Sequence, residues 1–155
     1  MKLFLTTLIF LITFFSVSFD YIEDGHFTLS LKSQKLPSKK KFTLYENKGS
    51  WTNNYGNYGT FFCYGSIQSV TKSFEGLLVI CEHLDSDDEK FWVLYERSND
   101  GDEGGSGKAT YIEGLGKWKN FKGTKCIFAT KYKGSSGFSK KKCKLTENLH
   151  KELQK

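Results

Sequence analysis

Proline and arginine are almost missing from this sequence. It contains one proline, Pro37, and one arginine, Arg97, although 23 of its 155 residues are lysine or arginine. Arginine reads bases and phosphates through a planar, bidentate group, whereas lysine is a point charge on a flexible stem. We therefore expect no nucleic-acid binding, and we interpret the lysine excess, with a formal net charge of +6, as a source of solubility.

Charge is missing near the N-terminus. After Lys2, the run LFLTTLIFLITFFSVSF is uncharged and has the length of a signal peptide. Its threonines and serines suit a membrane span poorly, because a span needs about 20 consistently apolar residues. The small residues Ser16-Val17-Ser18 predict cleavage before Phe19. We expect residues 1–18 to be a signal peptide and the protein to be exported, periplasmic or secreted, with no membrane span after cleavage. A retained N-terminal anchor is the alternative.

Closely spaced cysteines are missing too. The four cysteines are Cys63, Cys81, Cys126 and Cys143, and none forms a C-x-x-C pair. Structural zinc sites usually take their ligands from such pairs, so we expect no metal and no cofactor. An even number of cysteines in an exported chain predicts two disulfides.

The remaining residues, 19–155, suit a single domain with its own core. Aromatic residues make up 16% of the sequence and 15 residues are glycine, which favours strands separated by glycine turns. We expect strands at Phe27–Ser33, Lys40–Glu46, Gly59–Gln68, Glu75–Leu84, Lys90–Arg97, Gly107–Glu113, Lys125–Tyr132 and Phe138–Leu145.

Short links between these strands predict an antiparallel meander, and about eight strands are enough to close a barrel. The expected fold is therefore all-β, an eight-stranded antiparallel β-barrel. Gly49–Tyr58 is interpreted as a loop over the barrel mouth. Thr146 precedes residues at helical spacing, which predicts a short C-terminal helix that Thr146 caps.

The predicted hairpins place the cysteines in pairs. Cys63 and Cys81 stand symmetrically about Lys72, inside a predicted turn, so a tight hairpin makes them face each other. Cys126 and Cys143 flank the turn at Lys133–Gly137 almost as evenly. Four cysteines allow three pairings, and hairpin symmetry favours 63 with 81 and 126 with 143.

The stretch GGSGKAT, Gly104–Thr110, has some features of a phosphate-binding loop. Asp102 stands where that pattern requires its first glycine, and Ala109 stands where it requires a hydroxyl. The residues that follow are typical of a strand instead of a helix. We therefore expect a glycine-rich hairpin loop here and no nucleotide site.

GLGKWKNFKG, Gly114–Gly123, predicts a bulged, kinked corner between two strands, because glycine permits positive φ and close backbone approach. Trp118 and Phe121 are expected to pack inward. The lysines of this segment, Lys117, Lys119 and Lys122, are expected to stay in solvent.

The pattern G-x-G-x-aromatic-x-x-x-x-G, with Gly114, Gly116, Trp118 and Gly123 after the strand Gly107–Glu113, resembles the corner motif of the allene oxide cyclase and dirigent barrel superfamily. It is also similar to small exported bacterial proteins that share this barrel. The resemblance extends over about Gly59–Leu145. It implies an eight-stranded barrel, often trimeric, that holds an apolar or aromatic ligand. No catalytic residue of the plant enzymes has a matching position in this chain.

Several polar residues are weighed as sites. His83, beside Glu82 and the run Asp85–Glu89, suggests a general base, although the faces of a strand alternate and packing is the simpler interpretation. The acidic runs Asp85–Glu89 and Asp100–Glu103 lack the spacing of a calcium loop and are interpreted as solvated turns. Lys140–Lys142 is expected to protect a sheet edge or face water; acidic polysaccharide, lipid headgroups or a protein are alternative contacts.

The aromatic residues Phe61, Phe91, Trp92, Tyr111, Trp118, Phe121 and Phe128 are enough to fill an eight-stranded barrel. If a cavity remains, Tyr111, Trp118 and Phe121 are the candidate ligand contacts. We therefore expect a binding or structural protein, without enzymatic activity, that holds a small apolar ligand. An allene-oxide-cyclase-like isomerase or cyclase acting in the barrel, and an envelope interaction module with a lysine-rich face, are the alternatives. Cavity volume and the layout of the lysines distinguish the three.

Overall fold

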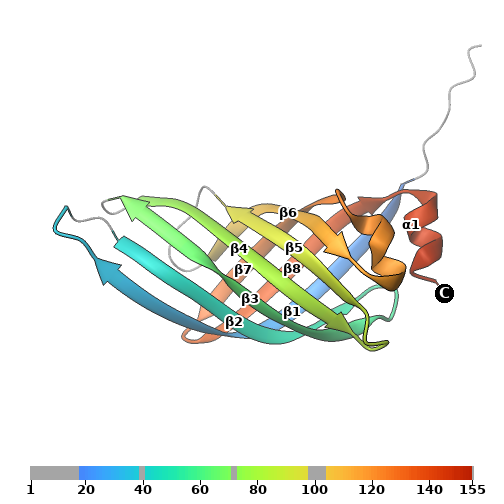
Figure 1. Ribbon diagram of the computed structural model, residues 1–155, viewed down its shortest axis with the longest axis horizontal. Coiled ribbons are helices and arrows are strands. Elements are labelled where there is room, and N and C mark those ends of the chain that lie inside the picture. The colour runs from blue at the N-terminus through green and yellow to red at the C-terminus, as the bar shows by residue number, and fades with distance from the viewer. Residues whose placement is uncertain (1–17, 39–40, 71–72, 98–103, 155) are drawn as a thin grey trace, which may run out of the picture.

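The protein is an eight-stranded, closed antiparallel barrel in which every strand pairs with its neighbour in the chain and the last strand pairs with the first (Figure 1). The computed structural model describes residues 18–38, 41–70, 73–97 and 104–154. The expected all-β barrel with a short C-terminal helix is confirmed. Within the predicted signal peptide, residues 1–17 lie outside the described residues, as do residues 98–103, which include the acidic run Asp100–Glu103.

The elements are β1 (Phe19–Lys35), β2 (Lys41–Asn53), β3 (Tyr58–Val70), β4 (Ser73–Asp85), β5 (Lys90–Arg97), β6 (Gly104–Gly114), the 3-10 helix η1 (Gly116–Phe121), β7 (Lys125–Lys133), β8 (Ser136–Leu145) and the helix α1 (Glu147–Glu152). The strands predicted from the pattern all exist. Most are longer than predicted, because long tilted strands extend beyond their most apolar residues.

The predicted loop Gly49–Tyr58 over the barrel mouth is shorter than predicted, because only residues 54–57 form the turn between β2 and β3. Its first half continues β2 to Asn53, and Trp51 is buried in the core. Gly49 marks a close approach of strands and no turn, because a Cβ at this position would lie 2.0 Å from the carbonyl oxygen of His26. The glycine-rich hairpin loop predicted at Gly104–Thr110 is wrong, because these residues belong to β6.

Both disulfides join cross-strand neighbours within a hairpin. Cys63 and Cys81 are direct register partners of β3 and β4, and Cys126 and Cys143 are partners of β7 and β8. The structure contains the disulfides Cys63–Cys81 and Cys126–Cys143. The two pairings are those that hairpin symmetry predicts.

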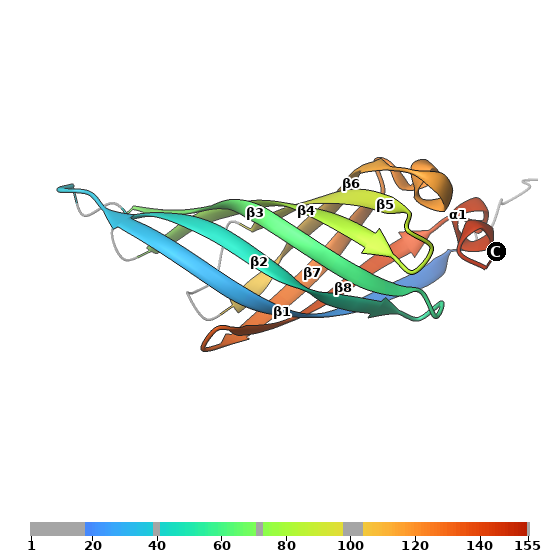
Figure 2. The ribbon, with the colours of Figure 1, turned by 60° about the horizontal axis from the view of Figure 1, so that its bottom comes forward.

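One end of the barrel is covered by η1 and α1, which lie together in Figure 2. The corner predicted as a kinked loop is thus a short helix. Trp118 and Phe121 turn inward from it and are fully buried, as predicted. At the C-terminus, the Thr146 hydroxyl accepts a hydrogen bond from the Leu149 N–H, which confirms the expected cap.

A dense set of polar contacts holds η1 against the turn between β4 and β5. Gly116 has φ of +54°, and a Cβ there would overlap the carboxylate of Glu89. Glu89 in turn accepts the N–H of Lys117 at 2.9 Å. The Lys117 ammonium lies 2.9 Å from Asp85 and also pairs with Asp87. The expectation that Lys117 stays in solvent is therefore wrong, because two carboxylates draw it onto the barrel end.

Candidate functional site

A buried ion pair lies inside the barrel, where β1 meets β8. Glu23 and Lys141 are direct register partners, and the Lys141 ammonium lies 2.8 Å from the Glu23 carboxylate. The Tyr21 hydroxyl donates to the same carboxylate at 2.6 Å. The ammonium also lies 4.6 Å from the centre of the Tyr111 ring and 3.4 Å from the Tyr95 hydroxyl. The aromatic rings and the carboxylate together stabilise a charge that burial would otherwise disfavour.

His83 is part of this interior cluster. Its ring stacks on Phe91 with the two centroids 4.5 Å apart, and its Nε2 lies 3.8 Å from the Glu23 carboxylate. Burial, and then the charge of Lys141, holds the pKa of His83 well below its usual range. Burial lowers the pKa of Lys141 as well, and Glu23 opposes this shift. A neutral, stacked His83 fits the packing interpretation.

Sequence proximity suggests the wrong carboxylates for His83. Glu82 points outward, where it accepts hydrogen bonds from Lys90 at 2.8 Å and from the Trp92 indole at 3.2 Å. Asp85 is buried and accepts the Trp118 indole N–H at 2.8 Å. The acidic neighbour of His83 is instead Glu23, on a distant strand, which no local pattern could have indicated.

The predicted solvated turn at Asp85–Glu89 is wrong for Asp85. Its second carboxylate oxygen accepts the N–H groups of Asp87 and Glu89, both at 2.9 Å. Burial opposes its ionisation, but the hydrogen bonds from Trp118 and Lys117 outweigh burial and lower the pKa of Asp85. Asp85 is therefore a structural anchor for η1. Within the described residues, no cluster of three potential metal ligands is present.

The barrel interior is filled by side chains. A cavity of about 40 Å³ remains near Asn47, His83 and Arg97, which is the space of a few water molecules. Drug-sized ligands occupy pockets of about 300–1,000 Å³. The candidate ligand contacts Tyr111, Trp118 and Phe121 are fully buried and pack against one another. A ligand role for them stays a prediction that this packing does not favour.

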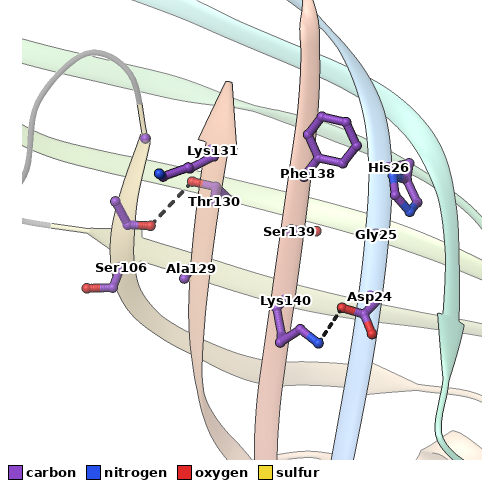
Figure 3. A pocket seen from close by; sticks show the side chains of 12 residues that line it. Asp24, Gly25, His26, Ser106, Ala129, Thr130, Lys131, Phe138, Ser139 and Lys140 are labelled. Carbon is purple, nitrogen blue, oxygen red and sulfur yellow. Dashed lines mark hydrogen bonds and ion pairs between the residues drawn. The ribbon is translucent and has the colours of Figure 1, made fainter. Parts of the chain in front are cut away.

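The outer face of the barrel carries two adjoining hollows along β7 and β8. The first, of about 770 Å³, is shown in Figure 3 and is lined by Asp24, Gly25, His26, Gly104, Gly105, Ser106, Ala129, Thr130, Lys131, Phe138, Ser139 and Lys140. The second, of about 660 Å³, is lined by Asp20, Glu96, Lys108, Thr110, Lys125, Cys126, Ile127, Lys142, Cys143 and Lys144. We call the two together the lysine groove.

The two hollows lie next to each other, because their linings follow one another along β7 and β8. Ile127 faces Lys142 across the ladder in the second hollow, and Ala129 faces Lys140 two residues along in the first. From Phe138 to Lys144 the groove follows β8 for about 20 Å, at about 3.4 Å per residue. This length is suited to an extended ligand.

The groove has more positive than negative charge. Six lysines and three acidic residues line it. Lys140 pairs with Asp24 at 2.9 Å, as Figure 3 shows, and Lys144 pairs with Asp20 at 2.6 Å. The other four, Lys108, Lys125, Lys131 and Lys142, form no ion pair with any residue in the described part of the chain.

The run Lys140–Lys142 is divided between two environments. Lys140 and Lys142 face the groove, whereas Lys141 points into the barrel and is buried. The interpretation that this run protects a sheet edge is wrong, because β8 pairs with β1 on one side and β7 on the other and so has no free edge. The two outward lysines face solvent instead, with Lys140 paired to Asp24.

Comparison with protein-family models, with curated proteins and with solved structures found no match. The resemblance of Gly114–Gly123 to the allene oxide cyclase and dirigent corner thus stays a prediction. The two disulfides fit an oxidising compartment. In the described ranges, no helix has both the length and the apolar character that crossing a membrane requires.

Proposed function

We propose that this protein is an exported binding protein whose lysine groove holds an extended acidic polysaccharide. The observation that carries the proposal is the juxtaposition of four lysines without ion pairs, Lys108, Lys125, Lys131 and Lys142, along one concave strip of the outer wall. A polymer with repeated carboxylates or sulfates can reach all four, because Lys125 and Lys131 lie about 20 Å apart along β7, and Lys108 and Lys142 flank Ile127 between them.

The shape of the site favours a chain over a surface. A membrane is flat or convex at this scale and would leave the floor of a groove uncontacted. The lining includes the small residues Gly25 and Ala129, and Ile127, which is 66% exposed, projects between Lys108 and Lys142. An extended polymer contacts the floor and the lysines together.

An exposed aromatic ring favours sugar over phosphate. Phe138 is 51% exposed at the far end of the groove, and its ring meets that of His26 edge to face, with centroids 5.1 Å apart (Figure 3). The apolar face of a pyranose packs on such a ring, whereas a phosphate chain gains nothing from it. The scarcity of arginine in the sequence also disfavours nucleic acid.

The interior is consistent with a site on the outside. A cavity of about 40 Å³ is small for the apolar ligand, and for the isomerase or cyclase substrate, that the barrel resemblance implies. Those two functions stay hypotheses that require the core to open. An outer groove requires no such rearrangement, which is why we favour it.

The test is titration calorimetry with polygalacturonate, and with neutral dextran as the control polymer. We expect binding to polygalacturonate alone, weakening as salt is added. Lys125→Ala with Lys142→Ala should lower the affinity about tenfold, since two exposed charge contacts are worth roughly 1–2 kcal/mol together. Lys32→Ala with Lys119→Ala removes the same charge from exposed positions outside the groove and should change the affinity little.

A second variant separates sugar from other polyanions. Phe138→Ala should weaken binding of polygalacturonate and leave binding of polyphosphate unchanged. Equal binding of polygalacturonate and dextran, or equal losses in the two lysine double variants, would contradict the groove. Preference for anionic vesicles over both polymers would assign the lysines to lipid headgroups instead.

A further inference from the structure

The opposite wall of the barrel exposes a contiguous apolar face. Its centre is formed by Phe62 and Tyr64 on β3 and by Leu78 and Ile80 on β4, which are 52%, 62%, 53% and 46% exposed. Tyr64 faces Ile80 across the ladder, and Ile80 faces Leu94 on β5. The partly exposed Trp92 and Leu94 and the exposed Leu44 extend it on either side. We call this set the apolar face.

The apolar face lies on the other side of the barrel from the lysine groove. In a closed eight-stranded barrel β4 is four strands away from β8 in either direction. Figure 1 shows β3, β4 and β5 across the front, with β7 and β8 behind them. A partner on the apolar face therefore does not compete with a ligand in the groove.

The size of the face is that of an interface. Four half-exposed large side chains leave on the order of 400 Å² of apolar surface, at the level where a patch on a monomer is often functional. With Leu44, Trp92, Leu94 and the surrounding polar rim, the area approaches the roughly 800 Å² per partner of a standard interface. Aromatic side chains at the centre of the patch match the composition of such interfaces.

The charges around the face indicate the occupant. Glu46 and Lys48 are neighbours on β2, directly beside Tyr64 and Phe62 in the register. Glu82 and Lys90 form an ion pair of 2.8 Å on the other side. Glu96 lies directly beside Leu78 on β5, so the rim carries both signs, with three acids and two lysines. Anionic headgroups or a strongly charged protein would require charges of one sign around the face. A second copy of the chain, related by two-fold symmetry, can place the acid of one chain against the lysine of the other.

We propose that the apolar face binds a second copy of this chain, so that the protein is a two-fold symmetric dimer with β3 and β4 of the two barrels packed face to face. Antiparallel sheets pack in this way about 10 Å apart with interdigitated side chains. The isologous arrangement buries Tyr64 and Ile80 of both chains at its centre.

The dimer would present two lysine grooves on opposite outer sides. If the groove binds an acidic polymer as proposed above, two grooves allow one dimer to bridge polymer chains, with the gain in avidity that bivalence gives. The dimer itself does not depend on that function. The residues of the apolar face and those of the groove are separate sets.

The test is sedimentation equilibrium of the disulfide-bonded protein over a dilution series. We expect twice the chain mass at micromolar concentration. Tyr64→Glu with Ile80→Glu should give the monomer mass, because each dimer would bury four carboxylates without partners. The matched control is Ile127→Glu, an equally polar substitution at a more exposed apolar residue in the groove, and it should remain dimeric.

Two further measurements keep the outcomes distinct. The thermal unfolding of the monomeric variant should still be cooperative, which separates lost association from lost folding. Its affinity for short oligogalacturonate should equal that of a single wild-type groove. A wild-type protein that is monomeric at all concentrations, or a double variant that stays dimeric, overturns the proposal. Flotation of a monomeric wild-type protein with uncharged lipid vesicles would assign the apolar face to lipid.

Discussion

The ammonium of Lys141, on the last strand, lies 2.8 Å from the carboxylate of Glu23, on the first, and the two residues are direct partners in the ladder that closes the barrel. Both side chains are almost completely buried. A shift of one residue in this ladder would turn every side chain of β8 to the opposite face and leave Glu23 without its partner. We therefore expect the pair to favour the observed register of the seam between the two ends of the chain.

Removing one member of this pair should be more damaging than removing both. Lys141→Met leaves the Glu23 carboxylate buried without a counter-charge, which should lower the free energy of unfolding by about 3–5 kcal/mol. Lys141→Met with Glu23→Gln should recover part of that loss. Urea unfolding of the three proteins measures both effects. Equal stability of Lys141→Met and the wild type would show that the seam does not depend on this pair.

His83 should make the protein less stable in mild acid. Burial holds its pKa well below the ordinary value of 6.5 in the folded state, so below pH 6.5 the unfolded chain binds a proton that the folded chain does not. The free energy of unfolding then falls as the pH falls, by at most about 1.4 kcal/mol per pH unit and about 2 kcal/mol by pH 5.

The matched variant for this effect is His83→Phe, which keeps a ring stacked on Phe91. Denaturant unfolding at pH 7.5 and pH 5 should show a smaller loss for the variant than for the wild type. Glu23 and Lys141, which neighbour His83, are present in both proteins, so the difference reports His83. The same loss in both would mean that His83 is protonated in the folded barrel.

The disulfides should be closed and stabilising. Intact protein should contain no thiol that alkylates without reductant. Cys63→Ser with Cys81→Ser opens a loop with a sequence separation of 18, and should lower the stability by about 3 kcal/mol. Alkylation with mass spectrometry and urea unfolding test the two statements. Four reactive thiols in the native protein would contradict the pairing.

Gly116 and Gly123 form a matched pair for measuring the strain at the barrel end. Both have positive φ, at +54° and +85°, but only Gly116 lies where a Cβ would meet another group, the carboxylate of Glu89. Gly123→Ala should cost about 1 kcal/mol from the backbone alone. Gly116→Ala and Gly116→Val should cost more, up to about 3 kcal/mol, because Glu89 must also move away from η1.

Thermal unfolding of these glycine variants checks the order. The Asp85 and Glu89 contacts to η1 explain the expected difference, so Glu89→Ala should remove most of the extra cost at Gly116. Identical melting of Gly116→Ala and Gly123→Ala would indicate that η1 shifts freely.

Much of the fold follows from local features of the sequence. The strand positions, the hairpin partners of Cys63 and Cys126, and the cap at Thr146 all depend on residues a few to about twenty positions apart. Periodicity and turn chemistry act over this range. Gly49 and Gly104 were predicted to lie in loops but lie in strands. A glycine that permits a turn and a glycine that permits close strand packing cannot be distinguished in sequence.

The candidate sites were hidden from local reasoning. The run Lys140–Lys142 gave no indication that its middle residue lies in the core, and the neighbours of His83 suggested carboxylates that point elsewhere. The lysine groove draws on β6, β7, β8 and β1, with Glu96 from β5, and the apolar face draws on β2 to β5. Along each strand, the outward residues of these sites alternate with inward ones. No single segment therefore shows which outward residues of different strands lie together.

The sequence by itself determined an all-β chain of eight strands whose hairpins bring two pairs of cysteines together, because these features depend on short separations along the chain. Only the tertiary structure decided which strands meet at the seam, how full the interior is, and which lysines share one wall. Those properties arise when closure places the first strand beside the last, and the side chains of distant segments then compete for the same volume.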